Sequence, residues 1–230
     1  MSAEKEVYAF HADQYDLLIQ REDHQSNILP AIEAITSLQG LKAIDLGAGT
    51  GRLSRLLAPR VSFLHAFDTS VAMLAVAAKS LEAMSLSNWS TSAADHRSIP
   101  LGAGSVDLIV SGWSFCYLSV WGGDLWRQNL ESAYKELERI IRPGGPVILF
   151  ETLGTGNEEP NPPAKLKRYF DWLAEKGFES TWIRTDYQFR SLEEALELGT
   201  FFFGEDMGDR IRKNNWVQLP ECTGVWWKHW

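Results

Sequence analysis

Three glycines at alternate positions follow an apolar run near the start of the chain, in the stretch Ala-Ile-Asp-Leu-Gly-Ala-Gly-Thr-Gly at 43–51. Residues 42–46 read as a strand, and residues 52–58 as a helix that ends before Pro59. Glycine has no Cβ, so it permits a tight turn and lets a ligand approach the backbone. In an open α/β sheet, ligands bind beyond the carboxyl ends of the strands. The loop at 47–51 therefore predicts a ligand site.

Residues in and beside this loop help to distinguish between two classes of ligand. A dinucleotide-binding loop has the spacing G-x-G-x-x-G, but Arg52 stands where the third glycine would be. A pyrophosphate needs free N–H groups at a helix N-terminus, and the Asp45 carboxylate would repel it. A ligand with an ammonium or a sulfonium group would instead be attracted. The loop thus disfavours a dinucleotide oxidoreductase, which stays open as an alternative.

Strands and helices alternate through the first 150 residues. Further strands are expected at 62–67, 89–93, 106–110 and 147–150, and helices at 71–84 and 124–141, with Ser70 as an N-cap. This alternation is typical of right-handed parallel crossover units. It predicts an α/β fold with an open, doubly wound, Rossmann-like sheet.

The two ends of the chain follow another pattern. Residues 1–40 read as helical, with Ser26 capping a helix that runs to Leu38 and holds Pro30 in its first turn. After Glu151 we expect a helix at 164–176, a strand at 181–189, a helical segment at 191–214 and a last strand at 223–227.

Five motifs occur in the order typical of class I S-adenosylmethionine-dependent methyltransferases, and residues 41–151 resemble this family, in particular its small-molecule, type 11-like members. The glycine loop resembles the first motif, and Phe67-Asp68-Thr69-Ser70 followed by Met73 resembles the second. The other three are Ala94-Asp95-His96 with Ile99-Pro100-Leu101, Val106-Asp107-Leu108-Ile109-Val110-Ser111, and Leu137-Glu138-Arg139-Ile140-Ile141-Arg142-Pro143-Gly144-Gly145.

The resemblance implies S-adenosylmethionine as the cofactor and a role for several residues. Asp68 would accept hydrogen bonds from both ribose hydroxyls, and Met73 would lie against the adenine. Asp95 would accept a hydrogen bond from the adenine amino group. Tyr15 with Asp16 resembles an N-terminal lid pair, in which the tyrosine reaches the cofactor. The expected cofactor-binding residues are Tyr15, Asp45, Gly47, Ala48, Gly49, Asp68, Thr69, Met73, Asp95, His96 and Ser111.

The family fold implies a seven-stranded sheet whose last strand is antiparallel and lies beside the fifth. We expect one domain over 1–230, with a helical lid at 1–40, a cofactor-binding core at 41–151 and the final strands within 152–230. The helical insertion at 191–214 departs from a simple hairpin, and we expect it to help cover the pocket.

The loop after the fourth strand should face the reactive methyl group. Its aromatic residues Trp113, Phe115 and Tyr117 indicate a small apolar or aromatic acceptor, or an amine held over ring faces. We expect Cys116 to pack rather than to act as a nucleophile. The possible bases His11, His24 and His96 are expected to be structural or on the surface. No catalytic residue is assigned, and no metal-ligand spacing occurs.

The charge composition limits the kinds of partner that we expect. The chain has 22 basic and 30 acidic residues, a net charge of -8, which disfavours nucleic acid as the main partner. Two basic clusters, 165–168 and 210–213, keep a methyltransferase that acts on RNA or protein open. A cofactor-binding protein without transfer activity is a further alternative. The N-terminus lacks a signal peptide and no apolar run is long enough to span a membrane, so we expect a cytoplasmic protein.

Overall fold

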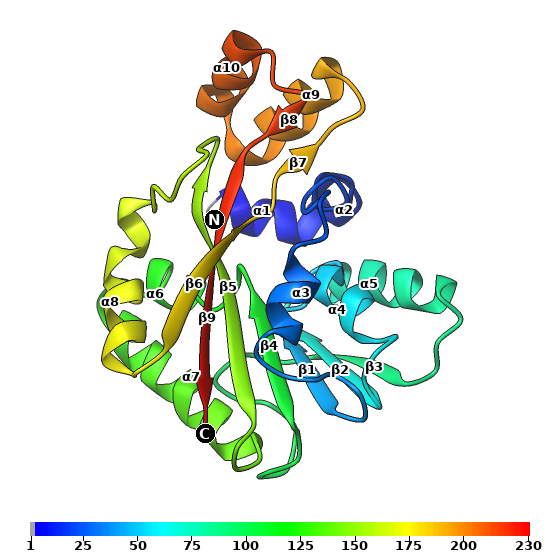
Figure 1. The fold of residues 1–230 in the computed structure, drawn as a ribbon, viewed down its shortest axis with the longest axis vertical. Helices are drawn as coiled ribbons and strands as arrows, with labels where there is room; N and C mark the ends of the chain where they lie inside the picture. Colours follow the sequence, from blue (N-terminus) through cyan, green and yellow to red (C-terminus); the bar gives the residue numbers. More distant parts are fainter. Residues whose placement is uncertain (1–2) are drawn as a thin grey trace.

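The computed structural model describes residues 3–230 and contains a central, largely parallel sheet (Figure 1). Among these residues the sheet has seven strands in the order β3-β2-β1-β4-β5-β9-β6. The strands are β1 (Lys42–Leu46), β2 (Phe63–Asp68), β3 (Trp89–Ala93), β4 (Leu108–Gly112), β5 (Pro146–Thr155), β6 (Glu179–Arg184) and β9 (Glu221–His229). Strand β9 runs antiparallel to both β5 and β6, and the other pairs are parallel. This arrangement confirms the predicted fold class, including the antiparallel last strand beside the fifth.

Helices cover both faces of the sheet. On one face α3 (Ile28–Glu33), α4 (Arg52–Leu57) and α5 (Val71–Ala83) enclose a core that includes Ala43 and Val110. On the other face α7 (Trp126–Ile140) and α8 (Lys167–Glu175) enclose a core that includes Ile44 and Ile109. Neighbouring residues of β1 and β4 thus face opposite cores, as the two-residue period of a strand requires. Both faces are apolar, which explains the continuous apolar runs of these strands.

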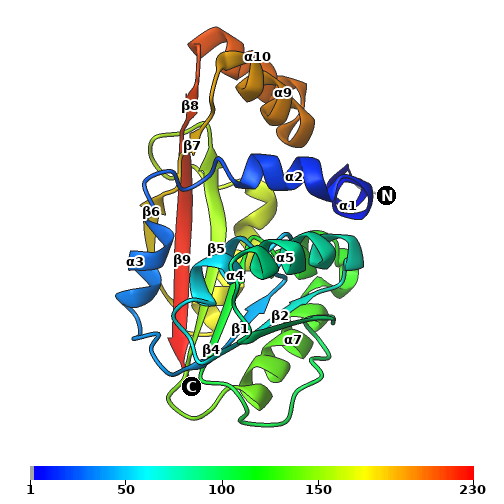
Figure 2. The same ribbon diagram turned by 90° about the vertical axis from the view of Figure 1, so that its right-hand side faces the viewer.

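A second layer lies beyond the carboxyl ends of the parallel strands (Figures 1 and 2). It consists of α1 (Ala3–Phe10), α2 (Ala12–Ile19), α9 (Leu192–Phe203), α10 (Glu205–Asn214) and the ribbon of β7 (Tyr187–Gln188) and β8 (Gln218–Leu219). Leu18 of α2 is buried in the core of the insertion. The Arg21 guanidinium donates to both oxygens of Glu194, at 3.2 and 3.0 Å, and joins the N-terminal segment to α9.

Two local predictions are wrong. Ser26 does not cap a helix: its φ is +59°, and α3 begins at Ile28 and ends at Glu33, short of Leu38. The Asp23 carboxylate instead accepts the backbone N–H groups of Asn27 and Ile28, at 2.7 and 3.1 Å. These bonds satisfy donors that the first helical turn leaves free, so the cap comes from outside the expected position.

The second error lies at 181–189, which forms two strands rather than one. Strand β6 ends at Arg184, and the chain then leaves the sheet to pair β7 with β8. The Asp186 carboxylate accepts the backbone N–H of Glu221 at 2.9 Å and holds the Arg184 guanidinium at 2.8 Å. A side chain thus replaces the ladder hydrogen bond there, which lets the chain turn away. The predicted cap at Ser70 is confirmed, since its hydroxyl accepts the Met73 N–H at 3.3 Å.

Candidate active site

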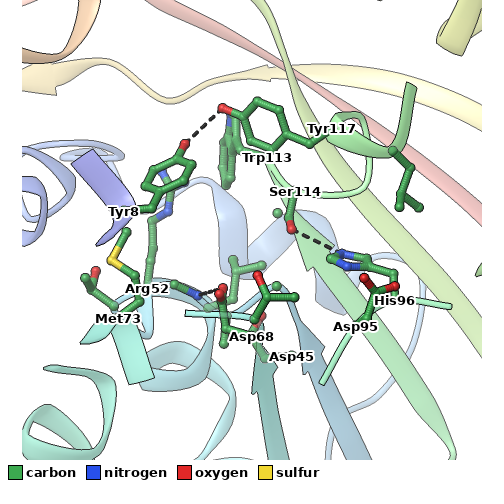
Figure 3. Close-up of a pocket in the computed structure, with 18 of the residues that line it drawn as sticks. Tyr8, Asp45, Arg52, Asp68, Met73, Asp95, His96, Trp113, Ser114 and Tyr117 are labelled. Atoms are coloured by element: carbon green, nitrogen blue, oxygen red, sulfur yellow. Dashed lines mark hydrogen bonds between the residues drawn. The ribbon is translucent and has the colours of Figure 1, made fainter. Parts of the chain in front are cut away.

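A cavity of about 360 Å³ opens at the carboxyl ends of β1, β2 and β4, where the sequence predicts a ligand site. Figure 3 shows its side chains converging from the sheet below and from the helices above. The lining residues are Tyr8, Tyr15, Ile19, Asp45, Gly47, Ala48, Gly49, Thr50, Arg52, Leu53, Asp68, Thr69, Met73, Asp95, His96, Arg97, Gly112, Trp113, Ser114, Tyr117, Leu118, Trp121, Gly122 and Asn129. We refer to it as the first cavity.

The glycine loop forms the floor of the first cavity. Gly47 has a φ of +76°, and an added Cβ there would overlap the Ser114 side chain. Gly49 has a φ of +54°, with open space where its Cβ would stand. Its N–H donates to the Asp68 carboxylate at 2.9 Å, and the Ser70 N–H donates to the other oxygen at 2.8 Å. The loop and the end of β2 therefore fix the Asp68 carboxylate through backbone donors.

Two buried polar groups lie next to the loop. Asp45 is almost fully buried, and its carboxylate accepts the Ser54 hydroxyl at 2.6 Å. Burial raises the pKa of Asp45 to about 6. Among the described residues, the Thr50 hydroxyl is buried on the cavity wall without a hydrogen-bond partner. Buried polar groups are normally paired, so this hydroxyl is an exception in the wall of the cavity.

The segment after β3 lines the opposite side. The Arg97 guanidinium binds both Asp95 oxygens at 2.7 Å, which lowers the pKa of Asp95. His96 lies beside it and contacts the Ser114 hydroxyl through Nε2 at 3.1 Å (Figure 3). Burial lowers the pKa of His96 to about 4, so its ring is neutral at pH 7.

Aromatic residues close the top of the first cavity. The hydroxyl groups of Tyr8 and Tyr117 lie 2.9 Å apart, and this contact joins α1 to α6 (Tyr117–Val120) across the opening (Figure 3). Tyr15 packs edge-on against Tyr8, and burial raises its pKa to about 12. Phe202 of the insertion stands 5.2 Å from the Tyr15 ring, centroid to centroid.

In the sequence, Arg52 stands out only because it occupies the position where a dinucleotide-binding loop would have its third glycine. Its guanidinium lies 3.5 Å above the centroid of the Trp113 ring and forms an ion pair with Glu22. The side chain is mostly buried. A stacked and paired guanidinium is held rigidly, so Arg52 places a fixed cation in the wall of the cavity.

A second cavity, of about 280 Å³, adjoins the first. Six residues line both: Tyr8, Tyr15, Ile19, Arg52, Trp113 and Tyr117. Beyond this common wall the second cavity is lined by Glu22, Cys116, Val120, Glu151, Thr152, Thr155, Pro163, Lys165, Leu166, Tyr187, Phe202, Phe203 and Glu221. It lies below the insertion, where β5 and β9 leave the sheet.

The structure brings most of the predicted residues to the first cavity. Ser111 and Phe115 are exceptions and line neither cavity. Ser111 is buried within β4, and Phe115 packs against Tyr169 and Trp172 in the core. The chain turns between the end of β4 at Gly112 and the start of α6 at Tyr117, and this turn directs Phe115 inward while Trp113 and Tyr117 line the cavities. The position of Ser111 therefore does not support a role in binding the cofactor, and that of Phe115 does not support a role in binding the substrate.

Of the other candidates, the two histidines lie apart from the site, whereas Cys116 lines the second cavity. His11 and His24 are exposed, and neither lines the two cavities. Cys116 is buried and burial raises the pKa of its thiol, which disfavours the thiolate. The basic clusters include residues bound within the chain, since Arg168 donates to Ser119 and Arg210 to the Gly156 carbonyl.

Sequence reasoning missed Tyr8, Glu22, Glu151 and Glu221. Tyr8 lies on α1 and Tyr15 on α2, and the chain leaves the helical conformation at His11 between them, so no helical spacing links the two in the sequence. The three glutamates have no local signal either, because their proximity arises only when α2, β5 and β9 meet. Within the described part of the chain, no cluster of His, Cys, Asp or Glu could hold a metal ion, and no helix is long and apolar enough to cross a membrane.

Comparison with known proteins identifies the core. Residues 44–149 match the family model described as a methyltransferase domain. Over 140 residues the chain is 35% identical to the malonyl-[acyl-carrier protein] O-methyltransferase of Marinomonas sp. (strain MWYL1), covering 59% of this chain and 47% of that protein. The protein of the same name from Salmonella typhimurium is 34% identical over 146 residues, covering 64% of this chain and 51% of that protein. The chain thus spans about half the length of these two relatives.

Solved structures show the same fold. The S-adenosylmethionine-dependent methyltransferase from Aquifex aeolicus superposes with a TM-score of 0.60 at 16% identity, covering 94% of this chain and 96% of that one. Together with the strand order and the domain match, this defines the class. Residues 44–149 thus match a methyltransferase domain, the strand order is that of the class I fold, and S-adenosylmethionine is the cofactor of such a domain.

Proposed function

We propose that this protein transfers a methyl group from S-adenosylmethionine, held in the first cavity, to a small molecule held in the second. The observation that carries this proposal is the common wall: two adjoining cavities share Tyr8, Tyr15, Arg52, Trp113 and Tyr117 at the end of the sheet where the methyltransferase motifs meet. A donor in one cavity would therefore lie next to an acceptor in the other.

The residues of the first cavity fit the cofactor. Gly49 leaves open space beside the backbone, and Thr50, whose hydroxyl has no hydrogen-bond partner among the described residues, lines the same cavity. Asp68 would hold the ribose hydroxyls, Met73 would line the adenine side, and Asp45 would lie nearest the cationic amino-acid end. The role proposed for Asp95 is weaker, because Arg97 already occupies both of its oxygens.

The bound cofactor supplies an electrophilic methyl group on a sulfonium, whose carbon–sulfur bond breaks as the acceptor lone pair bonds to the methyl carbon. The chain has to position the acceptor and exclude water. Proximity and orientation of this kind contribute about 7–11 kcal/mol. The contact between Tyr8 and Tyr117 and the Phe202 ring close the site from above, which suits both tasks.

The wall common to both cavities favours a small methyl acceptor that is partly apolar or aromatic. Four aromatic rings line it: Tyr8, Tyr15, Trp113 and Tyr117. A second candidate comes from the relatives, whose names specify a malonyl group on an acyl-carrier protein and oxygen as the methylated atom. Arg52 favours this candidate, because a guanidinium can bind a carboxylate. Its existing ion pair with Glu22 weighs against it.

Two measurements test the proposal. Thermal shift with S-adenosylmethionine, S-adenosylhomocysteine and NAD should show stabilisation by the first two, and stabilisation by NAD alone would overturn it. Transfer of labelled methyl groups into a metabolite extract, followed by mass spectrometry, should label a small molecule. Label found only in RNA or protein would support a macromolecular acceptor instead. Tight cofactor binding without any transfer would favour a binding protein.

A further inference from the structure

The second cavity is lined by three buried carboxyl groups. Glu22, Glu151 and Glu221 all line it, and each is at most 8% exposed. They reach the cavity from three separate parts of the chain: the segment after α2, strand β5 and strand β9. A buried carboxylate is costly unless it is paired, so a cluster of three needs an explanation.

Two of the three have partners within the chain. Glu22 forms an ion pair with Arg52 and accepts the hydroxyl groups of Tyr187 and Thr185, at 3.0 and 3.3 Å. Glu151 accepts the backbone N–H of Cys116 at 2.9 Å. These contacts account for their positions without a ligand.

Glu221 differs from them. One of its oxygens, Oε1, accepts the Thr152 hydroxyl at 2.6 Å. Among the described residues, Oε2 has no hydrogen-bond partner although the residue is only 1% exposed. Burial and the nearby Glu22 raise the pKa of Glu221 to about 8. Glu221 thus lines the cavity with a carboxyl group of which one oxygen has no hydrogen-bond partner among the described residues, and Thr155 is the other hydroxyl side chain that lowers its pKa.

The remaining wall is mostly aromatic. Tyr8, Tyr15, Trp113, Tyr117, Tyr187, Phe202 and Phe203 line the cavity together with the carboxylates. Aromatic rings attract cations, and carboxylates attract them more strongly. Two cations line the cavity, the Arg52 guanidinium, which Glu22 neutralises, and the Lys165 ammonium, so the three carboxyl groups outnumber them.

We propose that the second cavity selects an acceptor with a protonated amino group, which donates a hydrogen bond to the Glu221 carboxylate while the rest of the molecule lies among the rings. This rests on the proposed function, because it names the substrate class of that site. The cavity of about 280 Å³ limits the acceptor to a small molecule. An acceptor whose binding group is a carboxylate would meet three acids there, so a malonyl group is disfavoured.

The test uses three probes with the same ring and different charges: phenethylamine, 2-phenylethanol and 3-phenylpropionate. Each is titrated calorimetrically into the full chain at pH 8.5, where Glu221 with its pKa of about 8 is mostly ionised, with and without saturating S-adenosylhomocysteine. We expect phenethylamine to bind at least 10-fold more tightly than the other two. Equal or tighter binding of 3-phenylpropionate, or no binding of any probe, would overturn the proposal.

Glu221→Gln keeps the shape of the side chain and removes its charge. This variant should bind phenethylamine at least 10-fold more weakly and S-adenosylhomocysteine as before. Glu197→Gln, on the exposed side of α9, is the matched control and should leave both affinities unchanged. Unchanged phenethylamine binding by Glu221→Gln would refute the role of this carboxylate.

The two proposals fail in different ways. If S-adenosylhomocysteine does not bind to the wild-type chain, the proposed function fails. The comparison of the three probes in the cofactor-free chain still decides whether the second cavity selects an amine.

Discussion

The two cavities hold their carboxylates in opposite ways. In the first, Asp68 receives backbone N–H groups from Gly49 and Ser70, which belong to the loops beside it. In the second, Glu221 receives one hydroxyl from Thr152, 69 residues away, and keeps one buried oxygen without a partner. Short sequence motifs therefore build the first site, whereas the meeting of distant elements builds the second.

This difference indicates what kind of ligand each site is suited to bind. A carboxylate fixed by neighbouring N–H groups is preorganised and serves a ligand that does not vary. A carboxylate left incompletely satisfied is costly to the fold, so it persists where a ligand completes it. We infer that the first cavity is adapted to the cofactor of the class and the second to the acceptor of this particular chain.

The largest expected effect concerns the energetic cost of Glu221. Its pKa in the folded chain is about 8, raised by burial above the ordinary value of 4.5. A raised pKa means that the stability contributed by the protonated form is complete below pH 4.5 and is lost as the pH rises through 8. Glu221→Gln lacks this loss, so above pH 8 it should be more stable than the wild type by on the order of 4 kcal/mol.

Urea unfolding of both proteins between pH 5 and 9 measures this difference. The gap should widen steadily with pH, whereas Glu197→Gln should track the wild type. Parallel curves for wild type and Glu221→Gln would show that the carboxylate is solvated, and the contrast between the cavities would disappear.

The glycine loop should give the next effect. Gly47→Ala introduces a Cβ that overlaps Ser114 at a φ of +76°. The positive φ costs roughly 1–2 kcal/mol and the overlap roughly 1–3 kcal/mol. Gly40→Ala is the matched control, with a φ of +80° and nothing within 4 Å of the added atom, so it carries only the first cost. Thermal unfolding should show a clearly larger loss of stability for Gly47→Ala than for Gly40→Ala. Equal losses would mean that the close approach of Ser114 to Gly47 does not matter for stability.

Asp68 tests the first cavity itself. Asp68→Asn removes the charge and one acceptor oxygen, while the backbone donors around it remain. Charge-assisted hydrogen bonds contribute about 1.5–3 kcal/mol, so S-adenosylhomocysteine should bind roughly 10- to 100-fold more weakly in calorimetry. Asp209→Asn, exposed on α10, should bind normally. Undiminished binding by Asp68→Asn would mean that this carboxylate serves only the fold.

The smallest effect should come from the wall common to both cavities. Tyr8 and Tyr117 share one hydrogen bond of 2.9 Å, so Tyr8→Phe, Tyr117→Phe and the double variant form a thermodynamic cycle. We expect a coupling of about 1 kcal/mol in the free energy of unfolding. Additive effects of the two changes would indicate that the hydroxyl groups act independently and do not join α1 to α6.

Local sequence patterns predicted the core well because its interactions are local. The apolar run of β1 and the cap at Ser70 depend on residues next to each other, and both agree with the structure. Phe115 was assigned to the acceptor site because it lies between Trp113 and Tyr117, but the turn between β4 and α6 directs it into the core. The break after Arg184 depends on Asp186 binding a strand that begins 35 residues later, and no local pattern reports that.

The central claim is that the glycine loop and Asp68 hold the cofactor while the second cavity holds the acceptor. A crystal structure of the chain with S-adenosylhomocysteine and phenethylamine tests it most directly. We predict the ribose at Asp68, the amino-acid end at the loop of Gly47 and Gly49, and the amine nitrogen within hydrogen-bond distance of Glu221. Cofactor product bound elsewhere, or an amine that avoids the carboxylates of the second cavity, would contradict the account.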